Sequence, residues 1–293
     1  MTDTTHQRVA TRQANYVKVA MLVFHIACLG VIVVGVSPVA ALVALGMYLV
    51  RAFGITAGFH RMLAHRSFKA SRPVQFALTL FGSLAVQGGP IWWVSHHRTH
   101  HRYTETDKDI HSPRTQGFWN AHIGWMMQAE SFMENGANSR DLHKYPEIKF
   151  LQRHYAAIIV AQMLAMFTLG WVLNVLNPGL GTSGLQMLVW GFFISTVALW
   201  HATFMVNSVC HRWGQQPYDA NDDSTNNWLV GLLAIGEGWH NNHHKFPYSA
   251  RHGLKWWQFD LTWIVLRSMA TLRLISDLRL PRKIGTASAD AAA

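Results

Sequence analysis

The sequence predicts an all-α integral membrane protein, in which four transmembrane helices support a cytosolic helical cap that holds a histidine-rich dimetal site. Half of its 293 residues are apolar and only 14% are charged. The apolar residues form blocks of roughly twenty, the length that a helix needs to cross the hydrocarbon core of a bilayer. Polar segments crowded with His, Arg and Trp separate these blocks. This layout is typical of a polytopic membrane protein.

Four apolar blocks are predicted to cross the membrane: residues 17–36, 39–58, 156–176 and 185–206. Ser37 and Pro38 form a tight turn between the first two blocks. A fifth apolar stretch, residues 76–86, is too short to span a bilayer. It is expected to dip into the membrane or to lie against the helical bundle.

The blocks and their connections form one domain, residues 17–280, with a polar N-terminal tail before it (1–16) and a disordered tail after it (281–293). No charged residue lies in the link between the first two blocks or in the link between the last two. Every Lys and Arg lies on the other side, which the positive-inside bias identifies as cytoplasmic. Both termini and the cap, residues 59–155 and 207–280, are therefore expected in the cytoplasm.

The formal net charge of +10 comes from Lys and Arg residues that flank the apolar blocks beside tryptophans. Such residues favour an anionic membrane surface. Nucleic-acid binding is not expected, because the sequence has no basic helix or motif for it. Cys28 lies in an apolar block and Cys210 in a histidine-containing segment, so a disulfide framework is not expected either. The polar first fifteen residues show no cleavable signal peptide.

Histidines gather in three clusters of the predicted cap: His60 with His65, then HHRTHH at 96–101, then HNNHH at 240–244. The pattern H-x-x-H-H occurs in both later clusters. Residues at i, i+3 and i+4 lie on one face of a helix, so each copy is expected to aim three imidazoles at one point. The members of the two copies are His97, His100 and His101, and His240, His243 and His244.

His60 and His65 are five residues apart, a spacing that a regular helix places on different faces. They can converge only from a helix end, or else they serve neighbouring metals. His211 is a further candidate ligand, because it follows the fourth apolar block. Nine imidazoles exceed what one ion binds, so two metal ions are expected. Neutral imidazole suits Zn, Cu, Fe and Ni, so the spacing alone does not select the metal.

The isolated histidines are expected to be packed or solvated rather than ligating. These are His25, His143, His154, His201 and His252. His111 and His122 lie in the cap and could support a metal site without binding the metal. His96 could point inward as well, because it lies four residues before His100. Trp239 stands at the equivalent place in the later copy of the pattern, which argues against His96 as a ligand.

Around these clusters the sequence resembles the membrane-bound delta-9 fatty-acyl desaturases, the family that includes stearoyl-CoA desaturase. The resemblance runs from about residue 40 to about residue 280, with the motifs in family order and spacing. The matching segments are GFHRMLAHRSFKA, GGPIWWVSHHRTHHRYTETDKDIHSP, FMVNSVCHRWG and GEGWHNNHHKFP. The segments GGPIWWVS and SARHGLKWWQFDLTWIVLR are more similar to bacterial and cyanobacterial members, which implies a bacterial inner membrane protein.

The resemblance implies O2-dependent desaturation of a long-chain fatty-acyl group at the delta-9 position by a pair of iron ions. It implies a mushroom-shaped fold with a kinked tunnel for the acyl chain. It also implies a separate electron donor of ferredoxin or cytochrome b5 type, because the chain has no HPGG-type haem-binding segment. Asn207 would contact one iron through water. The implied iron ligands are His60, His65, His97, His100, His101, His211, His240, His243 and His244.

The resemblance leaves the acyl carrier open between acyl-CoA and acyl-lipid. In the animal acyl-CoA enzymes an Arg-Asp pair before the second histidine motif helps to hold CoA, and here Ser95 and His96 occupy those places. One alternative function is a fatty-acyl or alkyl hydroxylase, since related enzymes share the histidine motifs. Another is a haem carrier or metal transporter, which would place ionisable residues in mid-membrane. Of the ionisable residues, only His25, Arg51 and His201 lie well inside the predicted spans.

Overall fold

The computed structural model describes residues 2–133 and 136–281, and within them four helices are long and apolar enough to cross a membrane. They are Thr4–Val34, Pro38–Ala64, Tyr155–Leu176 and Gly184–Ser208. The predicted class, all-α with four membrane helices, is thereby confirmed. The structure adds one small antiparallel pair of strands, β1 (Lys69–Ala70) and β2 (Ile275–Ser276). Apart from Pro281, the predicted tail 281–293 lies outside the described residues.

Most of the four spans consist of more than one helical segment. The first span consists of α1 and α2, and the second of α3 and η1. The third is α8 alone, and the fourth consists of α9, η6 and α10. Their bounds are α1 Thr2–Cys28, α2 Val31–Val34, α3 Pro38–Phe53, η1 Gly54–Ala64, α8 Tyr155–Leu176, α9 Gly184–Leu188, η6 Val189–Ile194 and α10 Ser195–Ser208. A short turn of 3-10 helix, η5 (Pro178–Leu180), links the third span to the fourth.

The cap consists of short elements from the two long connections. Their bounds are α4 Arg72–Ser83, α5 Pro90–Tyr103, α6 Phe118–His122, η2 Gly124–Met127, η3 Ala129–Phe132, η4 Ala137–Lys144, α7 Pro146–Arg153, α11 Trp228–Leu233, α12 His240–Lys245 and α13 Leu261–Thr271. The strand pair β1–β2 ties the start of the first connection to the end of the second.

The first span begins earlier than the sequence predicted. Helix α1 starts at Thr2, so the segment interpreted as a polar tail (1–16) is helical from there onward. Ala10 and Ala14, which lie one turn apart on α1, are only 1% and 2% exposed. Helix α1 packs against η3 of the cap. The helix therefore continues beyond the apolar block because its small residues find a packing partner in the cap.

The apolar stretch 76–86 lies mostly in α4. This helix packs against η1 and α3, so the stretch lies against the helical bundle, which was one of the two predictions. Glycines allow this close approach. A Cβ on Gly54 would lie 2.1 Å from the backbone nitrogen of Gly82, and one on Gly58 would lie 2.5 Å from the carbonyl oxygen of Leu78. Small residues at such positions let helix backbones pack closely. The contact fixes the end of the second span.

Arg51 is fully buried in the second span. Its guanidinium donates to Ser195 Oγ at 2.6 Å and to Thr196 Oγ1 at 2.8 Å, both on the fourth span. A charged group inside a membrane bundle is expensive unless it is paired in this way. Arg51 therefore ties α3 to α10.

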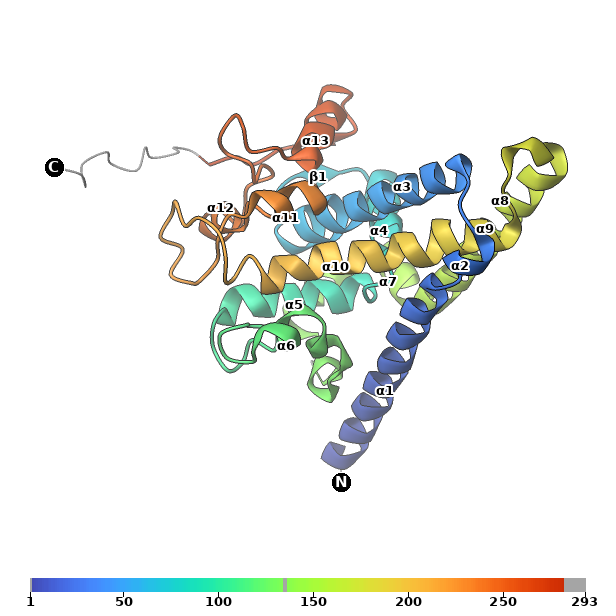
Figure 1. Ribbon diagram of the computed structural model, residues 1–293. Coiled ribbons are helices and arrows are strands. Elements are labelled where there is room, and N and C mark those ends of the chain that lie inside the picture. The colour runs from blue at the N-terminus through green and yellow to red at the C-terminus, as the bar shows by residue number, and fades with distance from the viewer. Residues whose placement is uncertain (1, 134–135, 282–293) are drawn as a thin grey trace.

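Figure 1 shows α10 running through the middle of the molecule, with α3 on one side and α5 on the other. The two short links between spans lie at one end of the bundle, where Trp190 Nε1 donates to the carbonyl oxygen of Gly35 at 2.8 Å. Helices α5 and α12, which carry the two H-x-x-H-H patterns, lie at the opposite end. The topology therefore gathers the histidine motifs at one end of the spans.

Candidate metal centre

Nine histidine rings converge in two adjacent groups at the cap end of the spans. Within each group, the ring nitrogens that could bind a metal all lie within 4.8 Å of one another. The first group contains His60, His65, His97, His101 and His243, and the second contains His100, His211, His240 and His244. All nine histidines singled out in the sequence are therefore brought together.

Each H-x-x-H-H pattern divides its rings between the two groups, so the expectation that all three would aim at one point was wrong. In α5, His97 and His101 join the first group while His100 joins the second. In α12 the division is reversed, because His243 alone joins the first group. On a helix, i+4 is displaced by about 40° in one direction and i+3 by about 60° in the other. Each helix thus contributes to both groups.

His60 and His65 reach the same group because the second span ends in a π-helix. The N–H of His65 donates to the carbonyl oxygen of His60 at 3.1 Å, five residues back. A hydrogen bond of this kind closes a π-turn, which brings residues five apart close to one face. The apolar block predicted that this helix ends at residue 58, but the helix continues to Ala64. His60 therefore lies inside the helix and His65 caps it.

The Nε2 atoms in each group are spaced as neighbouring ligands of one ion would be. The distances are His60–His243 3.1 Å, His65–His97 2.7 Å and His101–His243 2.9 Å in the first group, and His211–His240 3.0 Å in the second. Two metal–imidazole bonds of about 2.1 Å at a right angle separate their nitrogens by about 3.0 Å. Iron is among the metals that imidazole suits. The residues present therefore fit a metal ion in each group.

Four rings are held by carboxylates that were not predicted from the sequence. The pairs are His60 with Glu237, His100 with Asp109 (2.9 Å), His211 with Glu105 (2.8 Å) and His244 with Asp222 (2.6 Å). In every pair Nδ1 donates to the carboxylate, which leaves the Nε2 lone pair available. Carboxylates in this position orient a metal-binding imidazole and increase its basicity.

Three of these carboxylates had a signal in the sequence. Glu105 and Asp109 closely follow the second histidine motif, and Glu237 stands three residues before His240. Acidic residues this close to a histidine motif are candidate partners of its rings. Asp222 lies in the loop between His211 and His240 and adjoins neither, so only the fold reveals its role.

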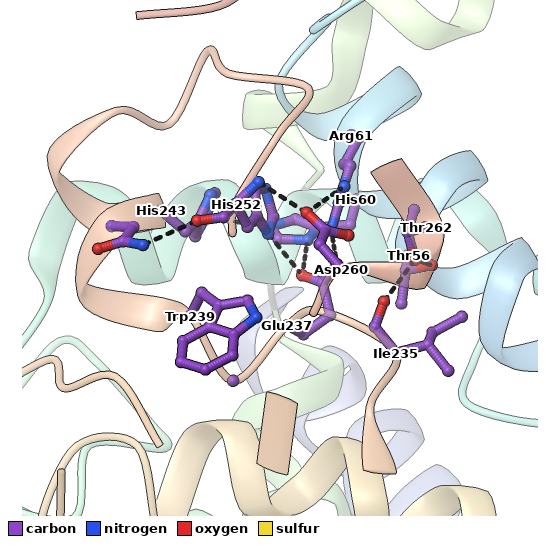
Figure 2. A network of polar contacts seen from close by, with 12 residues as sticks. Thr56, His60, Arg61, Ile235, Glu237, Trp239, His243, His252, Asp260 and Thr262 are labelled. Atoms are coloured by element: carbon purple, nitrogen blue, oxygen red, sulfur yellow. Dashed lines mark hydrogen bonds and ion pairs between the residues drawn. The ribbon is translucent and has the colours of Figure 1, made fainter. Parts of the chain in front are cut away.

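Glu237 also joins the first group to a buried ionic network, which Figure 2 shows. Its Oε1 accepts from Arg61 at 3.0 Å, and Arg61 donates to Asp260 Oδ1 at the same distance. Asp260 in turn accepts from the backbone N–H of Trp263 and so caps α13. Arg61 is fully buried. The ring of His60 is therefore positioned through Glu237 by Arg61, the next residue on η1, and by Asp260 at the start of α13.

Burial keeps most of the rings neutral. Burial, reinforced by the neighbouring imidazoles, holds the pKa of six rings well below its usual value: His65, His97, His101, His240, His243 and His244. Burial also lowers the pKa of His100, but the carboxylate of Asp109 outweighs burial and raises it. Neutral imidazole is the form that binds metal ions. The electrostatics of the site therefore favour metal binding.

Three further buried histidines lie beside the groups. The ring of His252 lies 4.5 Å from that of His243, and the ring of His111 stacks on that of His100 at 4.6 Å. His96 donates through Nε2 to the carbonyl oxygen of Ser131 at 2.8 Å, and among the described residues it belongs to neither group. His252 and His111 also form smaller candidate groups with a carboxylate, His60–Glu237–His252 and His100–Asp109–His111, beside the two larger groups.

The two histidines inside the spans, His25 and His201, form a separate chain with His122 of the cap. His25 Nε2 lies 3.1 Å from His201 Nε2, and His201 Nδ1 lies 3.0 Å from His122 Nε2. His122 Nδ1 lies 2.9 Å from Ser208 Oγ. This chain connects α1, α10 and α6 and is packed, as expected for isolated histidines. His143 and His154 are exposed, which is the other outcome expected for such residues.

A cavity adjoins both groups on the side of the spans. Its polar wall includes His60, His97, His100, His240 and Asn207. Its apolar wall includes Ile55 from the second span, Phe204 and Val206 from the fourth, and Trp93 and Met126 from the cap. Asn207 thus lines the same cavity as four of these histidines. The arrangement can hold an apolar chain against the converging rings.

Comparison with known proteins relates the chain to enzymes of lipid metabolism. Residues 35–275 match the family model described as fatty acid desaturase. An sn-1 stearoyl-lipid 9-desaturase of Anabaena variabilis is 43% identical over 78% of this chain and 80% of its own length. An acyl-CoA C20 Delta5-desaturase of Anemone leveillei is 42% identical over 79% of this chain and 71% of its own length.

A third relative, an icosanoyl-CoA 5-desaturase of Limnanthes douglasii, is 44% identical over 78% of this chain. The match spans only 61% of that enzyme's own length. These relatives are desaturases, which are oxidoreductases, and the match confirms the predicted resemblance. It favours an enzyme over a haem carrier or a metal transporter. The chain belongs to the fatty acid desaturase family of integral-membrane oxidoreductases.

Proposed function

We propose that the two groups of imidazoles each hold one iron ion and that the chain desaturates a long-chain fatty-acyl group with O2. The observation that carries the proposal is the convergence of nine ring nitrogens into two sets, each within 4.8 Å. The proposed ligands are those of the two groups, with Asn207 contacting one iron through water. When bound, the irons would supply the O2-derived oxidising power that no amino-acid side chain has.

The chain's own residues position the reactants. The apolar side of the cavity, which includes Ile55 and Phe204, would hold the acyl chain so that two neighbouring methylenes face the imidazole groups. Such fixed placement is a large part of catalysis and selects which carbons react. The carboxylates of Glu105, Asp109 and Asp222 hold their rings in one tautomer. Each ring thereby keeps Nε2 directed at its group.

We further propose delta-9 selectivity, which the stearoyl-lipid 9-desaturases of Anabaena variabilis and Synechocystis support by 43% and 39% identity. The carrier is an acyl-lipid or an acyl-CoA, since relatives of both kinds match. Electrons come from a separate donor of ferredoxin or cytochrome b5 type. The desaturase domain spans 17–280 and lies in a bacterial inner membrane, with both termini and the metal centre in the cytoplasm. The uncharged links support this orientation.

Expression in a desaturase-deficient bacterial host, fed with labelled saturated acyl chains, tests the proposal. Gas chromatography with mass spectrometry should reveal a monounsaturated product with its double bond at carbon 9, and the purified protein should contain iron. An alcohol as the main product would contradict desaturation and would favour the hydroxylase alternative. The lipid class that carries the labelled product identifies the acyl carrier.

A further inference from the structure

Two openings reach the imidazole groups, and different histidine rings line each opening. The cavity on the side of the spans is lined by His60, His97, His100 and His240. A second opening, a cleft of about 360 Å³, is lined instead by His65, His101 and His244. The two openings share no lining residue. The first includes residues of the second and fourth spans, whereas the cleft belongs to the cap and to the last residue of the second span.

The cleft opens to solvent and touches both groups. His65 and His101 belong to the first group and His244 to the second. His65 and His101 are partly exposed residues, whereas the side chain of His244 is only 2% exposed. His97, which lines the other cavity, is also partly exposed, and His60, His100, His240 and His243 are at most 4% exposed. The cleft therefore brings two rings of the first group to the surface of the cap, beside a buried ring of the second group.

The charged groups at the cleft leave free positive charge at its rim. Asp222 lines the cleft, but it accepts from His244 Nδ1 at 2.6 Å. Arg98 also lines it and is paired with Asp141 at 2.6 Å. Arg102 is exposed and, within the part of the chain that the structure describes, forms no ion pair.

Exposed charges of both signs lie just outside the lining. Lys245 donates to the backbone oxygen of Asp219, so its positive charge is not neutralised. Asp223 is paired with Arg114, while the carboxylate of Asp219 is exposed. The chain as a whole carries a formal charge of +10. Arg102 and Lys245 outnumber the exposed carboxylate of Asp219, and this excess of positive charge at the rim favours a partner with an acidic face.

Resting on the proposed function, we infer that this cleft is the docking site of the electron donor, a small one-electron carrier protein with an acidic face. Formation of one double bond with reduction of O2 to two waters takes two electrons and two protons from the substrate's C–H bonds. Two more electrons and two protons must come from outside. The acyl chain would fill the cavity on the side of the spans. A smaller pocket of the cap, about 200 Å³, reaches only His100 of the two groups, whereas the cleft touches rings of both groups.

The size of the cleft fits a transient encounter. Interfaces between electron-transfer partners are small and weak, and charged rims mainly speed their association. A loop or side chain of the carrier inserted into the cleft would lie against His65, His101 and His244. The acyl chain and the reductant would thus approach the same centre from separate sides and would not compete for space.

Charge reversal at Arg102 tests the inference. The purified protein in nanodiscs would be driven by an acidic [2Fe–2S] ferredoxin, kept reduced by NADPH and ferredoxin reductase. Alternatively, it would be reduced with dithionite in the absence of air, freed of excess dithionite and then given O2 for a single turnover. In Arg102→Glu, the ratio of ferredoxin-driven to dithionite-driven turnover should fall about tenfold at low salt, and the difference should shrink as salt rises. In the matched control Lys144→Glu, an exposed cap cation outside the cleft, the ratio should match that of the unaltered chain.

A steric block gives a second, independent test. In a Cys28→Ser background, Ala220→Cys at the cleft and His143→Cys elsewhere on the cap would be labelled with polyethylene glycol maleimide. The label at 220 should suppress ferredoxin-driven turnover and spare dithionite-driven turnover, while the label at 143 should affect neither. An unchanged ratio in both Arg102→Glu and labelled Ala220→Cys would overturn the docking site. Absence of unsaturated product from the unaltered chain with either reductant would overturn the proposed function and the inference with it.

Discussion

The Nε2 atoms of His60 and His243 lie 3.1 Å apart, although 183 residues separate them in the chain. His60 belongs to the π-helical end of the second span, and His243 to a six-residue helix of the cap. Cap and membrane bundle therefore meet at the candidate metal centre. A metal ion bound there would fasten the cap to the spans, so metal binding and cap stability should be linked.

Loss of one ligand should affect one group more than the other. His243→Ala removes a first-group ring and His100→Ala a second-group ring. Each change should abolish desaturation and reduce bound iron to about one ion per chain, because a missing ligand weakens one site. Metal analysis of the purified variants measures this, and membrane insertion should be unchanged. The control His143→Ala, on the exposed surface of the cap, should keep full iron content; a loss of iron there would count against the assignment.

Removal of a supporting carboxylate should weaken metal binding without removing a ligand. Asp222→Asn takes away the anion that holds His244 Nδ1. Changes of this kind typically reduce metal affinity by about 10–100-fold. Competition with a chelator measures the affinity. Asp223→Asn, next in the chain and paired only with Arg114 at the surface, serves as the control. Equal affinity in Asp222→Asn and the unaltered chain would exclude a supporting role for Asp222.

The apolar blocks and their lengths were enough to predict four membrane helices, because a span needs about twenty apolar residues whatever it packs against. The helical H-x-x-H-H patterns also predicted which histidines gather. The sequence could not show that His100 and His97 belong to different imidazole groups, since that depends on how α5 is rotated against α12. The π-turn at His60 and the packing of Ala10 against the cap likewise arise from tertiary contacts, which no local pattern encodes.

Close packing of η1 against α4 should make Gly54 sensitive to the smallest added side chain. A Cβ there would lie 2.1 Å from backbone atoms of α4, whereas a Cβ at Gly46 on the same span would meet nothing within 4 Å. Gly54→Ala should therefore destabilise the protein by about 1–3 kcal/mol. Gly46→Ala should leave stability nearly unchanged or raise it slightly. Thermal unfolding in detergent compares the two, and equal melting temperatures would show that α4 can move aside.

Acid should weaken the link between α6 and α10 through His122. Burial, followed by the neighbouring ring of His201, lowers the pKa of His122. Below the ordinary histidine pKa of about 6.5, the unfolded chain binds this proton more readily than the folded protein does. The stability that depends on neutral His122 is thus complete above about pH 6.5 and declines as the pH falls below that value. His122→Gln should show a smaller drop in melting temperature between about pH 7.5 and about pH 5.5; a drop as large as that of the unaltered chain would contradict this role.

The most direct measurement is the iron content of the intact, catalytically active protein, combined with Mössbauer spectroscopy of protein loaded with enriched iron. Two imidazole groups that each bind one ion predict two irons per chain, both in nitrogen-rich surroundings, in proportion to desaturase activity. An active preparation that contains no iron, or whose iron persists after both His100 and His243 are replaced, would show that the converging rings have another purpose.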